Sequence, residues 1–168
     1  MTTSRKASAV LLAGVVVGLV SGAALGVVWW ALAPRVPVVV RPGVTFPEGY
    51  QPEGFLAADV AFGVLALVAG VAITIGLASM RRDHLMSVLV GALLASAVGT
   101  AAMWFVGTRL GSVDIEGLIA TTTEDLVVDG PLEVSMPVMF IIWALASAVV
   151  VTILALSDWI AETRARQR

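Results

Sequence analysis

Four long runs without a single charged residue make up most of this chain, and they constrain its fold more than any other feature. The runs are Ala7–Ala33, Val60–Met80, Leu85–Thr108 and Val134–Ser157, of 27, 21, 24 and 24 residues. An α-helix rises about 1.5 Å per residue, so about 20 apolar residues cross a hydrocarbon core that is about 30 Å thick. All four runs are long enough, and they predict an all-α membrane protein with four transmembrane helices.

These runs explain a composition that is 59% hydrophobic but only 13% charged, roughly half the charged fraction of a typical soluble domain. Residues 1–168 are expected to form one transmembrane domain. Its expected helices are residues 7–33, 56–80, 85–108 and 136–158, with loops 34–55 and 109–135 on the outer side.

The distribution of charge between the loops predicts the orientation, because cytoplasmic ends of membrane helices keep Lys and Arg. Seven of the ten basic residues lie at the two termini and in the turn at 81–84, together with three acids. The other loops hold nine of the twelve acids and only three arginines. We therefore expect a plasma-membrane protein whose termini are both cytoplasmic.

The first run has a basic start and ends in Ala31-Leu32-Ala33, which is similar to a signal-peptide cleavage site. Its apolar stretch is much longer than the 7–15 residues usual in a signal peptide. Pro34 would also directly follow the cut. We expect an uncleaved helix.

Several classes of site are excluded by composition. The chain has no cysteine, one histidine (His84) and a net charge of −2. Cysteine-based metal sites and multi-histidine sites are therefore excluded, and a nucleic-acid partner is not expected at this charge. No cofactor or metal is predicted.

The most regular local pattern is a glycine stripe in the first run, made of Gly14, Gly18, Gly22 and Gly26 at a spacing of four. Small residues let two membrane helices approach closely, which is the main source of their association in lipid. The stripe predicts a tight helix–helix contact. The contact is expected within the chain, with a homodimer seam or a partner subunit as the alternative.

The second and third runs carry matching small residues, including Gly70, Gly91 and Gly99. They suggest a compact bundle of the first three helices, with the bulkier fourth helix at the periphery or facing a partner. Hydroxyl residues inside the runs are expected to form hydrogen bonds between helices. They are Thr74, Ser96, Thr100, Ser147 and Thr152.

Asp59 is the one acid within an otherwise apolar stretch, about one turn into the second helix. A charge at this depth needs a partner. Arg109, at the outer end of the third helix, is expected to form a buried pair with it, and Arg35 is an alternative. A favourable position near the helix N-terminus and a proton or cation site are the remaining interpretations.

Both outer loops carry β-strand signals. Residues 36–40 and 44–46 flank an Arg-Pro-Gly turn, and residues 126–128 and 132–134 flank an Asp-Gly pair. Asp-Gly favours hairpin turns, although Pro131 limits pairing. A small β cap is predicted in which the two hairpins pair or rest on the bundle. The acidic second loop is expected to be solvated.

The segments Gly26–Pro34 and Glu53–Gly63, separated by a valine-rich stretch, resemble a family of small four-helix membrane proteins of unknown function from high-GC actinobacteria. The resemblance implies a plasma-membrane protein of an actinobacterial envelope. It implies no chemistry and no functional residue.

These features predict a protein that is not an enzyme. We expect an accessory or scaffold subunit of an envelope or respiratory complex, which contacts the lipid bilayer and a membrane-protein partner or itself. The alternative is a small channel or solute carrier that acts as an oligomer. A membrane-permeabilising protein of phage type is a third class.

Overall fold

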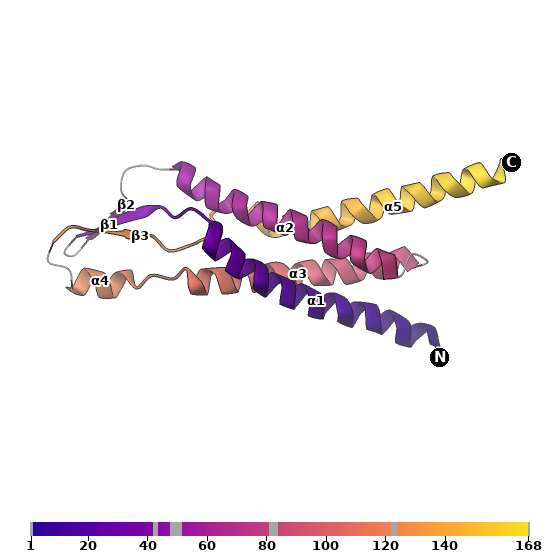
Figure 1. Cartoon of the computed structure of the whole chain (residues 1–168), viewed down its shortest axis with the longest axis horizontal. Coiled ribbons are helices and arrows are strands. Elements are labelled where there is room, and N and C mark those ends of the chain that lie inside the picture. The colour runs from indigo at the N-terminus through magenta and orange to yellow at the C-terminus, as the bar shows by residue number, and fades with distance from the viewer. Residues whose placement is uncertain (1, 42–43, 48–51, 81–83, 122–123, 168) are drawn as a thin grey trace.

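The chain forms four long helices and a small β-sheet in a computed structural model that describes residues 2–41, 44–47, 52–80, 84–121 and 124–167 (Figure 1). Side chains are described in residues 11–40, 53–80, 84–121 and 124–167. Five positions that the sequence assigns to turns lie outside the described residues: Pro42, Gly43, Arg81, Arg82 and Asp83. The long helices are α1 (Thr2–Leu32), α2 (Pro52–Met80), α3 (Leu85–Leu110) and α5 (Ile142–Arg166), which the short 3-10 helix η2 (Pro137–Ile141) precedes.

The predicted fold class is confirmed, because all four helices are long and apolar enough to cross a membrane. Each of them extends past its expected bounds at one end, α1 and α3 to Thr2 and Leu110. Helix α2 begins at Pro52, since a first helical turn does not need the N–H group that proline lacks. Helix α5 continues to Arg166 and carries Arg164 and Arg166 in its last turn. Positive charge there interacts favourably with the negative end of the helix dipole.

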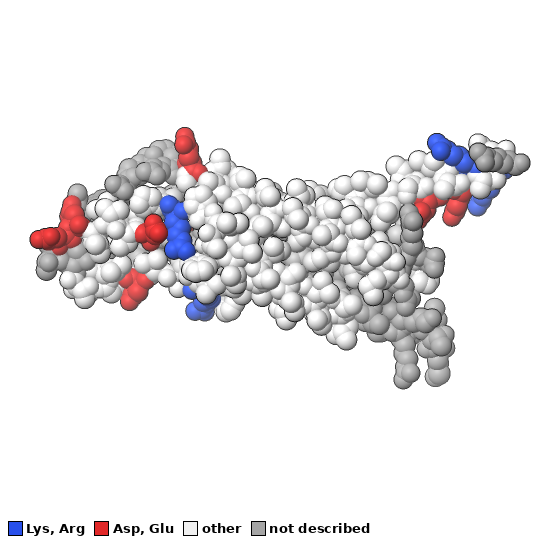
Figure 2. All heavy atoms as spheres, viewed as in Figure 1, with Lys and Arg blue, Asp and Glu red and all other residues white. Residues whose placement is uncertain are grey.

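Charged side chains gather at the two ends of the molecule and leave an uncharged band between them on the face seen in Figure 2. Both termini lie at one end of the bundle, and the β-sheet lies at the other (Figure 1). The arrangement is that of a multi-pass membrane protein with an even number of spans.

The glycine stripe of α1 packs within the chain, against α3. A Cβ atom added to Gly14 would lie 2.5 Å from the carbonyl oxygen of Gly91, and one on Gly26 would lie 2.7 Å from that of Met103. Cβ atoms on Gly18 and Gly22 would overlap the backbones of Ala95 and Gly99. Successive glycines of α1 contact successive positions of α3 in the same chain direction. Helices α1 and α3 therefore run parallel, with their backbones in direct contact.

Helix α5 enters the core through Trp143, which is fully buried. A Cβ on Gly70 of α2 would lie 2.7 Å from the Trp143 carbonyl oxygen, and one on Gly99 of α3 would lie 2.5 Å from the Trp143 ring. The two glycines make room for the indole between their helices. The expectation that the fourth helix is peripheral is wrong for the first part of α5, up to Val151, which is its last buried residue. The part of α5 after Val151 is peripheral, as expected.

The two outer segments join in one three-stranded antiparallel sheet of order β2-β1-β3. Strand β1 (Pro37–Arg41) lies in the centre, with β2 (Val44–Pro47) and β3 (Leu126–Asp129) on its two sides. Val39 of β1 is directly opposite Val127 of β3. The short helix α4 (Ile115–Thr121) connects α3 to this region. A β cap made by both loops therefore exists, and the first hairpin is as predicted.

The second predicted hairpin is wrong, because residues 132–134 form no strand. Pro131 has no N–H to donate to a ladder. Leu132 instead is buried against the bundle and donates its backbone N–H to the Gly111 carbonyl at 3.2 Å. With that pairing lost, β3 completes the sheet beside β1.

Candidate functional site

Asp59 is fully buried on α2 and binds the segment that leads into η2. Its two carboxylate oxygens accept hydrogen bonds from the backbone N–H groups of Ser135 and Met136, each at 2.9 Å. Hydrogen bonds to an ionised acceptor are about twice as strong as neutral ones. Asp59 therefore fixes the end of the outer segment to the membrane bundle across 76 residues of sequence.

The predicted pair between Asp59 and Arg109 is wrong. Arg109 is exposed, and its guanidinium carbon lies 5.2 Å from the centre of the Phe105 ring. Arg35, the alternative partner, lies over Trp30 at 5.9 Å and donates to the Trp30 carbonyl. Backbone N–H groups satisfy the carboxylate without burial of a second charge, which spares the bundle a large desolvation penalty.

An aromatic cluster surrounds this connection. Trp29 of α1 is fully buried and donates its indole N–H to the Ala58 carbonyl at 3.0 Å. Its ring meets Phe62 edge-on, with 5.0 Å between the ring centres, and Phe62 lies 5.7 Å from Phe140 of η2. Such edge contacts add to the stabilisation from burial itself. The cluster locks α1, α2 and η2 together at the depth of Asp59.

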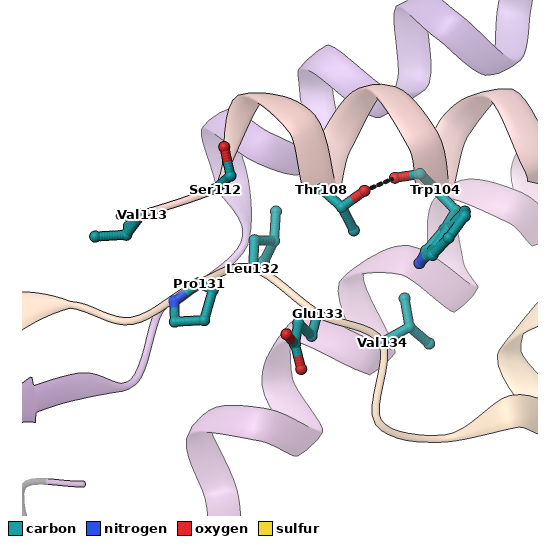
Figure 3. A pocket seen from close by; sticks show the side chains of 8 residues that line it. All are labelled: Trp104, Thr108, Ser112, Val113, Pro131, Leu132, Glu133 and Val134. Carbon is teal, nitrogen blue, oxygen red and sulfur yellow. Dashed lines mark hydrogen bonds between the residues drawn. The ribbon is translucent and has the colours of Figure 1, made fainter. Parts of the chain in front are cut away.

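A groove of about 350 Å³ lies beside the connection, between the outer end of α3 and the extended segment before η2 (Figure 3). One wall is formed by Trp104 and Thr108 of α3 and by Ser112 just beyond its end, and the other by residues 131–134. Thr108 donates its hydroxyl hydrogen bond to the Trp104 carbonyl at 2.8 Å. Figure 3 shows the indole nitrogen of Trp104 turned toward the extended segment.

The acidic outer segment uses one of its carboxylates for local structure. Asp114 accepts a hydrogen bond from the Gly117 N–H at 3.0 Å, at the start of α4. Within the described part of the chain, no three His, Cys, Asp or Glu residues are placed to share a metal ion.

The hydroxyl residues inside the spans form fewer hydrogen bonds between helices than predicted. Ser147 donates to the Gly70 carbonyl of α2 at 3.5 Å, whereas Ser96 and Thr152 bond carbonyls of their own helices. The hydroxyls of Thr74 and Thr100 are buried without a hydrogen-bond partner among the described atoms. Their methyl groups and small size, which permit close packing, account for their positions.

The predicted site residues thus separate into two regions. The glycines lie in the helix contacts described above, and Asp59 lies with the aromatic cluster. Sequence reasoning missed the backbone groups of Ser135 and Met136, since an N–H donor has no residue-type signature. It also missed Glu133, which lines the groove. No sequence signal linked Trp104 to Glu133, because the two residues are 29 positions apart and Glu133 lies in a segment without regular secondary structure.

Comparisons of the chain with protein-family models, curated proteins and solved structures give no match.

Proposed function

We propose that this protein is a non-enzymatic accessory or scaffold subunit of an envelope or respiratory complex in the plasma membrane, with both termini in the cytoplasm. The observation that carries the proposal is the use of Asp59. The one acid within the apolar part of a span is buried and bonded to two backbone N–H groups. A transport site would need this carboxylate to be reachable by its ion, whereas a scaffold needs the cap to be held firmly.

The helix contacts support the same proposal. Helices α1 and α3 touch backbone to backbone along the stripe, and Trp143 fills the space between Gly70 and Gly99. Such packing favours a rigid body over one that alternates between conformations. It leaves two surfaces for a partner: the outer sheet, and the part of α5 after Val151, where large apolar side chains such as Leu156 are exposed.

The charge distribution supports the orientation. Arg164 and Arg166 end α5 on the side of the termini, and acids dominate the sheet side. The positive-inside tendency favours a cytoplasmic location for the arginine-rich end. A protease added to intact cells should therefore leave a C-terminal tag uncut, and cleavage of the tag there would overturn this orientation.

Affinity purification of the tagged protein from native membranes in mild detergent, read by mass spectrometry, tests the scaffold role. A partner at fixed stoichiometry is expected. Val127→Lys, which places a charge on an exposed apolar position of β3, should reduce recovery of a partner that docks on the cap. Thr121→Lys, at the exposed end of α4, is the matched control and should not.

Recovery of only the protein itself, as a defined oligomer, would contradict the scaffold role. That result would favour the channel or carrier, and ion flux in liposomes with Asp59→Asn would then be the next measurement.

A further inference from the structure

A group of buried polar side chains lies where α2 packs against α5, within the apolar part of both spans (Figure 1). Its members are Thr74 of α2 and Trp143 and Ser147 of α5, all fully buried. They meet at Gly70 of α2. The Ser147 hydroxyl donates to the Gly70 carbonyl at 3.5 Å, and Thr74 lies one helical turn after Gly70 on the same helix face. A Cβ atom added to Gly70 would lie 3.0 Å from Cδ1 of Trp143, which is bonded to the indole nitrogen.

Two groups at this point have no hydrogen-bond partner among the described residues. They are the Thr74 hydroxyl and the Trp143 indole N–H. The bond that Ser147 donates is long for a hydrogen bond, and the Gly70 carbonyl has a second lone pair. Bulk water does not reach the apolar core of a membrane, so a polar group there that lacks a partner is costly. These groups therefore indicate a small ligand held between the two helices.

Close packing of side chains does not account for these polar atoms. Valine has the shape of threonine without its hydroxyl, so the methyl group of Thr74 would pack equally well without a polar atom. Trp29 shows how the same bundle treats another fully buried indole, because its N–H donates to the Ala58 carbonyl at 3.0 Å. Among the described residues, Trp143 lacks the acceptor that this equally buried indole has.

The chemistry of the site selects a small neutral ligand. The site offers the Trp143 N–H as a donor, the Gly70 carbonyl as an acceptor, and two hydroxyls that both donate and accept. The apolar runs that surround it contain no charged residue, so an ion would be buried there without a counter-charge, at a large desolvation cost. Water is neutral, donates and accepts, and a buried water typically makes about three hydrogen bonds to such groups.

We infer that an ordered water molecule binds between α2 and α5 at Gly70. It accepts a hydrogen bond from the Trp143 indole N–H and donates to the hydroxyl oxygens of Thr74 and Ser147. The water thereby joins α5 to α2 within the apolar part of the spans, in addition to the packing of Trp143. This inference goes beyond the scaffold role and does not depend on it.

Nuclear Overhauser spectroscopy of the whole isotope-labelled chain in detergent micelles tests the inference. The indole N–H signals of the five tryptophans are assigned, and their cross-peaks to water are measured in the laboratory and rotating frames, which separates direct contact from proton exchange. Trp143 should show a direct cross-peak to water. Trp29 is the internal control, because it is equally buried but bonded to a carbonyl, and it should show none.

Thr74→Val keeps the shape of the side chain and removes its hydroxyl. It should abolish the cross-peak between Trp143 and water. It should also lower the melting temperature by about 2–4 °C, which corresponds to the loss of one buried hydrogen bond in a chain of this size. Thr152→Val is the matched control, because that hydroxyl is exposed and bonds the Ala148 carbonyl of its own helix. It should leave the cross-peak in place and the melting temperature nearly unchanged.

Three results would overturn the inference. The first is the absence of a direct water cross-peak at Trp143 in the unmodified protein. The second is a cross-peak that persists unchanged in Thr74→Val. The third is a higher melting temperature of Thr74→Val, which is the result expected when a buried hydroxyl has no partner to lose.

Discussion

Gly22→Leu is expected to separate α1 from α3 and to lower the free energy of unfolding by about 3 kcal/mol or more. Overpacking of a side chain in a core costs about 1–3 kcal/mol when neighbouring side chains can move. Here the obstacle is the backbone of Gly99, so the helices themselves must part. Thermal or denaturant unfolding in detergent, followed by tryptophan fluorescence, measures the loss.

A matched control for this substitution exists two residues away. Ala24 is exposed on the same helix, and Ala24→Leu adds the same kind of side chain on the face away from α3. It should change stability by only a few tenths of a kcal/mol. Equal stability of Gly22→Leu and Ala24→Leu would contradict the parallel contact between α1 and α3.

Asp59→Ala should detach the outer segment from the bundle and lower stability by about 3 kcal/mol. It removes two hydrogen bonds to a buried charge, each worth about 1.5–3 kcal/mol. Hydrogen exchange gives the local readout, since the amides of Ser135 and Met136 should exchange faster than in the unmodified protein. Asp59→Asn keeps one carbonyl oxygen as an acceptor and should be intermediate.

Glu53→Ala is the control for Asp59, because it removes an exposed acid from the first turn of the same helix. It loses only a favourable interaction with the helix dipole, of about 0.3–1 kcal/mol. Unchanged exchange at Ser135 and Met136 in Asp59→Ala would show that the carboxylate does not hold this segment.

The four spans were predictable because the length of an apolar run is a direct physical requirement of the bilayer. The glycine stripe was predictable for a similar reason, since its spacing of four places all members on one helix face. The sequence of α1 alone does not indicate which helix packs against that face. The match with α3 comes from Gly91, Ala95 and Gly99, whose own spacing of four lets two backbones run in step.

The candidate site was harder to predict, because its partners are backbone groups and irregular chain. Asp59 was identifiable as a buried charge in need of a partner, and an arginine was the natural choice by residue type. The actual donors belong to Ser135 and Met136, whose side chains take no part. The pairing of β3 with β1 was likewise decided by Pro131 and by the burial of Leu132, which remove the nearer strand.

The central claim of this account is that two outer segments, far apart in sequence, join in one cap on a membrane bundle. A disulfide between Val39→Cys and Val127→Cys tests it most directly, because the chain has no cysteine of its own. The two positions face each other across β1 and β3. Gly130 donates to Val36 in the same ladder, so they fall at a non-hydrogen-bonded pair, with Cα atoms about 4.5 Å apart. This separation suits a disulfide.

Mild oxidation in native membranes should convert most of the Val39→Cys/Val127→Cys protein to an internally cross-linked form that migrates faster on a gel. The control pair Val39→Cys/Leu126→Cys should cross-link poorly, because neighbouring residues of a strand point to opposite faces of the sheet. Failure of the first pair to cross-link, or equal cross-linking of both pairs, would contradict the cap.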